Sequence, residues 1–494
     1  GPDCVRDLQG MFAFAIWDEE KRTLFAARDR LGKKPFVYWA GDGRFVFASE
    51  IAALLEHPAV PRRLDREALA HYLAWLVVPA PLTMLDGVRK LPPGHALTWD
   101  GRLSVRRYWE PRVEIGEAED YEERIVAALT DAVRRRLVAD VPVGAFLSGG
   151  IDSTIVAGLM PRGSRTFSIG FEEEKFSELP YAREAARAFG SAHHEEVVRA
   201  DSAAVLPELI ERYGEPFGDS SAIPTYFVSK ATARHVKVAL SGDGGDECFA
   251  GYLRYEAMAH LARLRRVPEA LLRFVSRLVP RATGRGERIG RLLGASKRPI
   301  EDLYIDLVTV FPREMRAELG ARGEVRARVA EPFLRAGADP VTAASFADLV
   351  TYLPDDLLVK VDIASMANGL EVRCPFLDPE VVDLAFRIPA RLKRRKSVLK
   401  RAFRDLLPPA IRRRAKMGFA VPLAEWLRGP LRGLLEDALL GKTARERGIF
   451  PPAVVERLVR EHLSGARDHR DRLWLLLVFE LWARRFLGGG VIGG

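Results

Sequence analysis

Val141-Pro142-Val143-Gly144-Ala145-Phe146-Leu147 is a short apolar run, and Ser148-Gly149-Gly150-Ile151-Asp152-Ser153 follows it directly. An apolar run of this length, bounded by turn residues, is typical of a strand buried in a parallel sheet. The glycines let backbone amides approach an anion, and the serines add hydroxyl donors. A helix beginning near Ile151 would point its positive end at the same place. The stretch therefore predicts a strand, an anion-binding loop and a helix.

This loop is not a phosphate loop of the Walker type, because it lacks the lysine of the GxxxxGK[ST] pattern. Asp152 would repel a bare phosphate, so we expect a cation between the two. Mg²⁺, which proteins hold through one or two carboxylates together with phosphate oxygens, supplies that cation.

The segments around this loop alternate between strand and helix patterns. Strands are expected at 166–171, 195–198 and 236–240, and helices at 181–189, 203–213 and 224–233. This alternation predicts an α/β fold with a doubly wound parallel sheet, in which ligands bind at the carboxyl ends of the strands. From residue 252 onward the periodicity is helical, so a helical C-terminal part is expected.

A second glycine-rich loop, Ser241-Gly242-Asp243-Gly244-Gly245-Asp246-Glu247, follows the strand expected at 236–240. If the two strands are neighbours, Asp152 and Asp246 could share one cation. A single glycine-rich turn with an acid is commonly only a turn, but two at strand ends of one sheet favour a site. The twelve-residue ligand spacing of an EF-hand is absent.

The first 110 residues read as β-rich. Short alternating runs at 11–17, 23–27, 36–39 and 44–48 are separated by turn residues, and helices are expected after Ser49 and over 65–76. The polar segment 110–120 contains Pro and Gly. It predicts a boundary between a domain at 1–112 and a domain at 113–494.

The net charge of +9 is concentrated in one place. The basic strip, Arg387–Lys416, holds thirteen Lys or Arg and one acid, so it carries +12 and the remainder of the chain −3. A solvated helix face would explain the strip, and so would a polyanion site. Because no aromatic interleaving or nucleic-acid fold pattern accompanies it, we favour a small phosphorylated ligand over DNA or RNA.

Composition excludes several other classes of protein. The three cysteines, Cys4, Cys248 and Cys374, are far apart, which argues against a disulfide scaffold or a cysteine-rich zinc site and fits a reducing compartment. No apolar run reaches the roughly 18 residues of a membrane span, and no signal peptide opens the chain. A cytoplasmic protein that binds no membrane is expected.

Several motifs resemble known families. The first loop resembles the pyrophosphate loop of the N-type ATP pyrophosphatases, which have an adenine nucleotide α-hydrolase-like fold. The second loop and four further stretches narrow the resemblance to the glutamine-dependent asparagine synthetase family. These stretches are 357–362, 365–373, Pro375-Phe376-Leu377-Asp378 and Lys416-Met417-Gly418-Phe419 with Val421-Pro422. The stretches 8–14 and 28–32 resemble the second half of the family's N-terminal-nucleophile glutaminase domain.

The resemblance implies that ATP adenylates the side chain of aspartate, that pyrophosphate leaves, and that ammonia displaces AMP to form asparagine. It places adenine on Leu147 and Ile169, and the AMP portion on Ser241 and Gly242. Pyrophosphate would lie on the first loop, through Ser148, Gly149, Gly150, Asp152 and Ser153. Asp152 and Asp246 would carry Mg²⁺.

Further roles are implied by motif position, and each has a structural alternative. Asp243 would assist attack by the amine as a base, or would be an outer ligand of the metal. Lys416 would neutralise pyrophosphate, or would belong to a solvated basic face. Glu371 is expected to be catalytic and Arg373 to bind substrate, or the two pair with each other. Ser220 and Ser221 would line the aspartate pocket.

The family's glutaminase uses an N-terminal cysteine whose amine acts as base and whose thiolate attacks glutamine. Cys4 is not N-terminal and lies where the family has no nucleophile. Glutamine hydrolysis is therefore not expected from the sequence as given. Either the first half of the glutaminase domain lies outside this sequence, or the protein uses free ammonia, and we favour the first explanation because half of a β-rich domain would leave strand edges exposed.

Three alternatives to an asparagine synthetase remain open from the sequence. The same chemistry would serve another carboxylate, as in β-lactam synthetase-like enzymes or amidotransferases of the cell envelope. A non-catalytic nucleotide-binding protein and a nucleic-acid-binding protein are the others. We expect small-molecule partners, namely aspartate, ATP, and ammonia or glutamine, and no nucleic acid. The oligomeric state is left open, a homodimer included.

Overall fold

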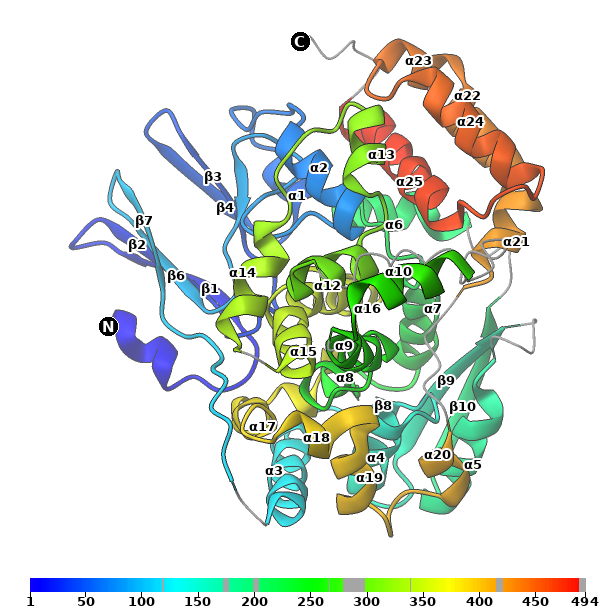
Figure 1. Ribbon diagram of the computed structural model, residues 1–494. Coiled ribbons are helices and arrows are strands. Elements are labelled where there is room, and N and C mark those ends of the chain that lie inside the picture. Colours follow the sequence, from blue (N-terminus) through cyan, green and yellow to red (C-terminus); the bar gives the residue numbers. More distant parts are fainter. Residues whose placement is uncertain are drawn as a thin grey trace.

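The computed structural model describes residues 1–117, 120–171, 177–198, 204–265, 267–278, 298–337, 339–414 and 421–487. A five-stranded parallel sheet lies in the lower half of the molecule, with strand order β10-β9-β8-β11-β12 (Figure 1). Its strands are β8 (Val143–Phe146), β9 (Arg165–Phe171), β10 (Ala192–Val198), β11 (Val238–Leu240) and β12 (Glu371–Arg373).

The strand order of this sheet reverses between β8 and β11. From β8 the chain proceeds outward through β9 to β10, then returns to β11 on the other side of β8. Val143 pairs with Val238, and Ala145 pairs with Leu240. This reversal is the place at which doubly wound sheets bind ligands, because the loops after the two strands part there. The expected fold class is confirmed, and the condition for a shared cation is met, because the two glycine loops follow neighbouring strands.

Strand β12 was not among the strands expected from the sequence. The helix before it is α16 (Leu358–Met366), and the chain then turns at Gly369 (φ +64°) into an edge strand. Only Val372 of its three residues is buried, and three residues are too few to display the alternation by which a strand is recognised.

Helices enclose the parallel sheet. Those interleaved with the strands are α3 (Tyr121–Arg136), α4 (Ile151–Leu159), α5 (Leu179–Phe189), α6 (Leu206–Tyr213), α7 (Ala222–Ala233) and α8 (Gly245–Cys248). The helical part that follows contains α9 (Leu253–Leu264), α10 (Glu269–Leu278), α12 (Ile300–Val308), α13 (Arg313–Glu318), α14 (Ala327–Arg335), α15 (Pro340–Val350), η4 (Leu353–Leu357), α16, η5 (Pro375–Leu377), α17 (Pro379–Ala385), α18 (Ala390–Lys393), η6 (Arg394–Lys396), α19 (Ser397–Ala402), α20 (Pro409–Arg413), α21 (Leu423–Arg428), α22 (Arg432–Leu440), α23 (Lys442–Arg447), α24 (Pro452–Leu463) and α25 (Arg470–Phe486). No helix in the described part of the chain is long and apolar enough to cross a bilayer.

The N-terminal part is built on two antiparallel sheets. One has the order β1-β2-β6-β7, and the other β4-β3-β5. The short helix η1 (Pro2–Arg6) precedes them, and α1 (Ile51–Leu54) and α2 (Arg66–Trp75) follow β4. The Asp65 carboxylate caps α2 by accepting a hydrogen bond from Ala68 N at 3.0 Å. The strands are β1 (Ala13–Asp18), β2 (Thr23–Arg28), β3 (Val37–Gly41), β4 (Arg44–Ala48), β5 (Val88–Lys90), β6 (His95–Trp99) and β7 (Leu103–Arg107).

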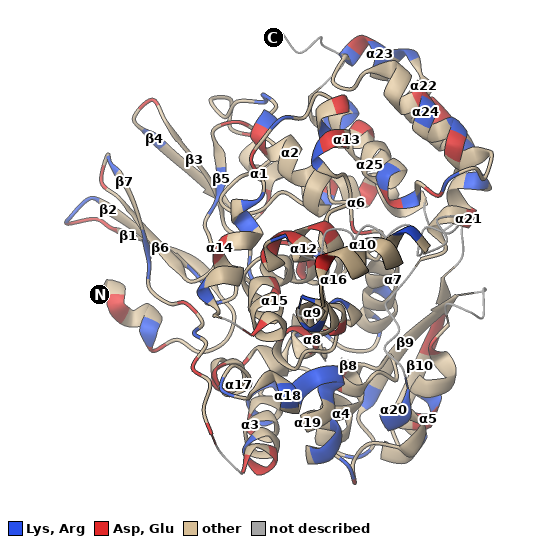
Figure 2. Cartoon of the chain, in the orientation of Figure 1, with Lys and Arg blue, Asp and Glu red and all other residues tan. Residues whose placement is uncertain are grey.

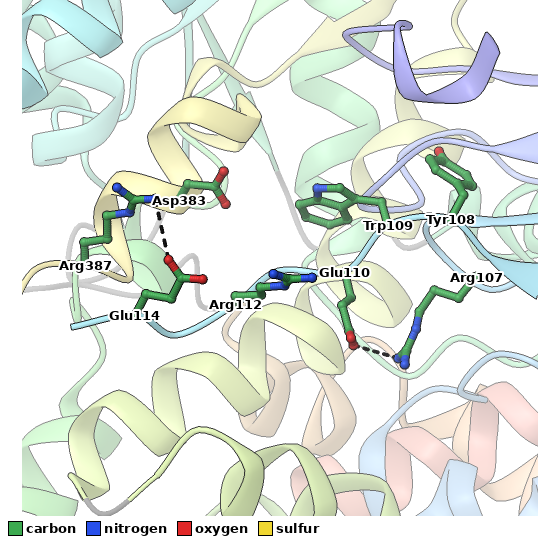
Figure 3. A pocket seen from close by; sticks show the side chains of 8 residues that line it. All are labelled: Arg107, Tyr108, Trp109, Glu110, Arg112, Glu114, Asp383 and Arg387. Atoms are coloured by element: carbon green, nitrogen blue, oxygen red, sulfur yellow. Dashed lines mark ion pairs between the residues drawn. The ribbon is translucent and has the colours of Figure 1, made fainter. Parts of the chain in front are cut away.

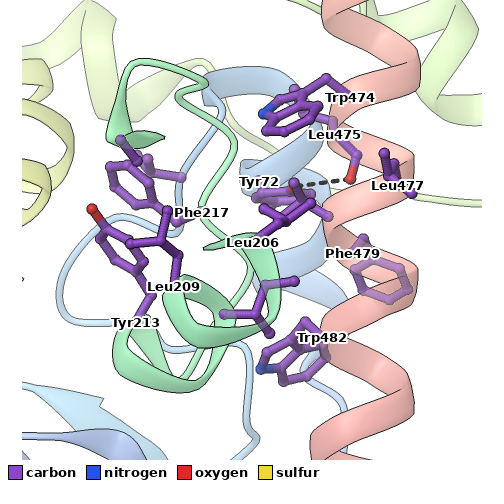
Figure 4. Close-up of a cluster of buried hydrophobic side chains, with 14 of the residues drawn as sticks. Tyr72, Leu206, Leu209, Tyr213, Phe217, Trp474, Leu475, Leu477, Phe479 and Trp482 are labelled. Atoms are coloured by element: carbon purple, nitrogen blue, oxygen red, sulfur yellow. Dashed lines mark hydrogen bonds between the residues drawn. The ribbon is translucent and has the colours of Figure 1, made fainter. Parts of the chain in front are cut away.

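One hydrophobic core joins the N-terminal part to the rest of the molecule. Side chains of α2, α6 and α25 meet in it, and Figure 4 shows Tyr72 between the helices, with its hydroxyl bonded to Leu475 O at 2.8 Å. Burial of each large side chain of this kind contributes roughly 1.5–3 kcal/mol. A half-buried ion pair between Lys34 and Asp362 at 2.7 Å adds a polar connection. The antiparallel sheets and the parallel sheet are therefore held in a fixed relation.

Candidate active site

The first loop has the form that an anion site requires. Gly149 has a φ of +67°, and a Cβ there would lie 2.5 Å from the backbone of Tyr181, so only glycine fits. The hydroxyls of Ser148 and Ser153 lie 3.0 Å apart, and Ser148 N donates to Ser153 Oγ at 3.2 Å. Because α4 begins at Ile151, both hydroxyls lie at its positive end. The loop can hold the oxygens of a phosphate group.

The two loops bring their carboxylates to one point. Lys396 Nζ pairs with Asp152 Oδ2 and lies 2.6 Å from Asp246 Oδ1. All three residues are buried. The donor set of two carboxylates beside an anion-binding loop is the one by which proteins hold Mg²⁺ with a nucleotide. The expectation that Asp152 and Asp246 lie together is thus met by the geometry.

Glycines of the second loop allow this close approach. A Cβ on Gly245 would lie 2.5 Å from Asp152 Cγ, and one on Gly242 would lie 2.8 Å from Asp152 Cβ. Both positions touch the first loop directly, so a larger residue at either would force the two loops apart.

Lys396 was not singled out from the sequence, where it was one of thirteen basic residues in the basic strip. Figure 2 shows the described part of this strip as blue segments on α18, α19 and α20. Arg395 and Lys396 have φ values of +51° and +58°, and such conformations cost about 1–3 kcal/mol each for residues other than glycine. This pair of unusual residues turns the Lys396 side chain inward, where pattern alone gives no signal.

Contacts with α9 and with the residues just before it stabilise the left-handed backbone of Arg395 and Lys396. Glu256 lies 2.7 Å from Arg394 and 3.1 Å from Arg395, and Arg395 N donates to Ala250 O at 3.0 Å. The two arginines lower the pKa of the Glu256 carboxyl, mainly through the hydrogen bond from Arg394. The segment that carries Lys396 is therefore anchored independently of the two aspartates.

Asp243 lies where the second loop meets the N-terminal part. Its carboxylate accepts a hydrogen bond from Ser241 Oγ at 2.6 Å, and Cys374 Sγ lies 3.9 Å away. Lys33, which follows β2, approaches Cys374 Sγ to 2.7 Å. Burial raises the pKa of Cys374 to about 11, so it is a neutral thiol near pH 7. Neither Lys33 nor Cys374 was singled out as a site residue from the sequence.

A buried polar cluster lies beside Ser221. Lys360 Nζ is 2.8 Å from both Asp219 Oδ2 and Ser221 Oγ, and Ser221 Oγ donates to Asp219 Oδ1 at 2.7 Å. Burial alone would raise the pKa of Asp219, but Lys360 and Ser221 outweigh it and lower that pKa. Burial and the neighbouring Asp219 raise the pKa of Asp356 well above its usual range. The hydroxyl of Ser221 is therefore engaged, whereas Ser220 lines a cavity of about 1920 Å³.

Glu371 and Arg373 lie on β12 and pair with each other. Arg373 Nε donates to Glu371 Oε1 at 2.6 Å, and Arg373 Nη1 donates to the carbonyls of Arg136 and Val138, each at 2.8 Å. The pairing of Glu371 with Arg373 is the structural alternative given for these two residues. The hydrogen bonds from Arg373 to the carbonyls of Arg136 and Val138 cap the end of α3. The roles of the two residues in catalysis and substrate binding stay predictions.

Of the apolar residues expected beside adenine, Leu147 directly follows β8 and Ile169 lies on the adjacent strand β9. Leu147 and Ile169 are both buried, and Leu147 N donates to Phe167 O at 2.8 Å. Lys416 lies outside the described residues. Arg414, two residues earlier, donates to Gly149 O at 3.2 Å and pairs with Glu178, so the chain just before Lys416 is attached to the first loop.

A separate hollow of about 440 Å³ lies where the N-terminal sheets lead into α3 (Figure 3). Its carboxylates already face arginines, since Glu110 lies 2.8 Å from Arg107 and Glu114 lies 3.6 Å from Arg387. None of the expected nucleotide or metal ligands lines this hollow. We therefore place the candidate site at the two loops.

Comparison with known proteins places both parts of the chain. Residues 124–484 match the asparagine synthase family, and residues 1–109 match a glutamine amidotransferase domain. A Mycobacterium tuberculosis protein provisionally named a glutamine-hydrolysing asparagine synthetase is 38% identical over 100% of this chain and 79% of its own length. Glutamine-hydrolysing asparagine synthetase 1 of Bacillus subtilis is 32% identical over 97% of this chain and 78% of its own length. An amidase of Gibberella zeae, chry2, is 26% identical over 96% of this chain and 78% of its own length. The chain therefore belongs to the asparagine synthase family and joins its synthase domain to a glutamine amidotransferase domain.

Proposed function

We propose that this protein is a ligase that converts aspartate to asparagine with ATP, through a β-aspartyl-AMP intermediate, releasing AMP and pyrophosphate. Ammonia is the nitrogen donor, normally supplied from glutamine. The observation that carries the proposal is the convergence of Asp152 and Asp246 beside an anion-binding loop at the reversal of the sheet. Family membership supports the same assignment.

The reaction needs activation because a free carboxylate is a poor electrophile with no good leaving group. Ser148, Gly149, Gly150 and Ser153 would hold the pyrophosphate portion of ATP. Asp152 and Asp246 would hold Mg²⁺, which when bound stabilises charge on the leaving pyrophosphate. Leu147 and Ile169 would contact adenine, and Ser241 and Gly242 the AMP portion. We assign Lys416 to neutralisation of the pyrophosphate.

The amide-forming half of the reaction would use residues near Asp243. A carboxylate there can accept a proton from the attacking amine, and the hydrogen bond from Ser241 orients it. Ser220 and Ser221 would border the aspartate pocket, with Ser221 acting through its contacts to Asp219 and Lys360. Glu371 and Arg373 are assigned to catalysis and substrate binding on motif position alone.

A second candidate is the same adenylation and amidation of a larger carboxylate. Relatives named amidases in Gibberella zeae and Penicillium rubens, each 26% identical to this chain, support the alternative. A panel of carboxylates, including peptides that end in aspartate, would distinguish the two.

The test is to mix the purified protein with ATP, Mg²⁺ and aspartate, add ammonium or glutamine, and follow AMP, pyrophosphate and asparagine. We expect asparagine in the ammonium arm, and its loss in Asp152→Asn. Absence of aspartate-dependent pyrophosphate from a folded, ATP-binding sample would overturn the assignment to aspartate. Pyrophosphate release with another acid would establish the alternative substrate.

A further inference from the structure

Lys396 fills the point on which the two carboxylates converge. Its ammonium pairs with Asp152, lies 2.6 Å from Asp246, and is buried together with both. We propose that Lys396 is a built-in counter-ion of the metal site, which holds Asp152 and Asp246 together before nucleotide binds and gives way when the metal–nucleotide complex binds. The inference rests on the Mg²⁺ and ATP site of the proposed function.

The two aspartates need a positive charge between them. Two buried carboxylates that face one point repel each other, and removal from water adds to the cost of keeping both ionised. Lys396 offsets this repulsion with a single charge. A divalent cation held by the same two oxygens would occupy the same place, so the ammonium and the metal exclude each other.

A lysine suits this exchange better than an arginine would. The ammonium is a compact charge on a flexible four-carbon stem, so it can leave one anion for another nearby without moving the backbone. The first loop, where Ser148 and Ser153 lie 3.0 Å apart, supplies the anion site beside it once phosphates are bound. Lys396 would then contribute to phosphate binding.

The backbone that presents Lys396 supports a functional role. Arg395 and Lys396 are both left-handed, and Glu256 holds Arg394 and Arg395 in place. Gly251 leaves the space through which the lysine passes, because a Cβ there would lie 2.2 Å from Lys396 Cε. Strained conformations that are secured by several independent contacts are typical of functional sites. The lysine is therefore placed by its surroundings rather than by the aspartates alone.

The proposal predicts opposite effects on two measurable quantities. Without the ammonium, a metal ion alone meets two unneutralised carboxylates and no competitor, so it binds more tightly. The reaction with ATP becomes slower, because a charge that faces the phosphates is lost. A lysine that merely supported the fold would, when removed, weaken metal binding and activity together.

The experiment uses the full chain, freed of metal and nucleotide. MnCl₂ is titrated into wild-type, Lys396→Met and Lys396→Gln protein, and free Mn²⁺ is measured by electron paramagnetic resonance. We expect the Kd for Mn²⁺ to fall about tenfold in both variants, as for loss of one competing charge in a buried site. Excess Mg²⁺ should displace the bound Mn²⁺.

Lys400→Met is the matched control, because it removes an equal charge from α19, which begins directly after Lys396. No ion pair joins Lys400 to Asp152 or Asp246 among the described contacts, so we expect less than about a twofold change in Kd. An unchanged or weaker Mn²⁺ affinity in both Lys396 variants, with circular dichroism like that of wild type, would overturn the proposal. Failure of both to fold would also overturn it, since the lysine would then be structural. The titration contains no aspartate or ATP, so tighter Mn²⁺ binding without asparagine synthesis would reject the proposed function and keep this inference.

Discussion

Gly251 lies directly against the Lys396 side chain, so that a Cβ on residue 251 would sit 2.2 Å from Lys396 Cε. The same Cβ would sit 1.9 Å from Asp246 Oδ1. Neither approach is physically possible without movement, so this glycine is required by the pair that it adjoins. The space at Gly251 and the charge at Lys396 are two parts of one arrangement.

Gly251→Ala should therefore impair the reaction while leaving the fold intact. The new methyl group would push Lys396 and Asp246 away from each other and from the common point. Displacements of about 1 Å in a catalytic group cost roughly a hundredfold in rate, and we expect a loss of that size in AMP formation. Gly433→Ala on α22 is the matched control, because a Cβ there meets nothing within 4 Å. Equal activity of the two variants would contradict the inference that a methyl group at residue 251 displaces Lys396 and Asp246.

Asp246→Asn should abolish pyrophosphate release without removing the residue's shape. The amide retains an oxygen but loses the charge that pairs with Lys396 and that would hold Mg²⁺. We expect a fall of at least about a hundredfold in the rate of aspartate-dependent pyrophosphate formation, as for loss of one preorganised electrostatic group. Asp437→Asn on α22 makes the same change at a side chain that is 66% exposed, and it should have no such effect. A fully active Asp246→Asn enzyme would exclude Asp246 as a metal ligand.

The convergence of the two loops was predictable from the sequence. Each loop directly follows an apolar run, and alternation of strands and helices places such loops at one edge of a parallel sheet. The identities of Asp152 and Asp246 as acids at those strand ends then suggested a shared cation.

The choice of Lys396 was not predictable, for a physical reason. Thirteen basic residues of the basic strip look alike by composition, and the one that enters the site is selected by left-handed backbone at 395–396 and by Glu256, 140 residues earlier. Contacts across such separations leave no periodic trace in a single sequence. Strand β12 was not predicted because three residues are too few to show the alternation of apolar and polar residues along a strand.

His71 on α2 should make the protein sensitive to acid. Burial, with smaller contributions from Arg328 and Arg316, lowers the pKa of His71 to about 4. The lowered pKa keeps the His71 imidazole neutral in the folded state, so stability falls as the pH drops below the unfolded pKa of 6.5. By pH 5 this amounts to roughly 2 kcal/mol.

The measurement for this prediction is the thermal midpoint between pH 7 and pH 5. His71→Leu should lose less stability on acidification than wild type, because the leucine has no proton to gain. His57→Leu, near α1 and only partly buried, is the control and should follow wild type. Parallel curves for wild type and His71→Leu would show that His71 is not responsible.

Asp356 and Asp219 should respond to pH with opposite signs, although the charge of Lys360 acts on both; only Asp219 pairs with the lysine directly, at 2.8 Å. Burial and Asp219 raise the pKa of Asp356, so its contribution to stability is greatest at low pH and is lost as the pH rises toward the folded pKa. Lys360 and Ser221 outweigh burial at Asp219 and lower its pKa, so that group stabilises above pH 3.8 and loses its effect as the pH falls through the folded pKa.

Asp356→Asn should raise the thermal midpoint at pH 7, with the gain vanishing near pH 4. Asp219→Asn should lower the midpoint at pH 7 because it leaves Lys360 buried with a weaker partner. Destabilisation of similar size in both variants at pH 7 would mean that the two carboxyls share the charge of Lys360 equally.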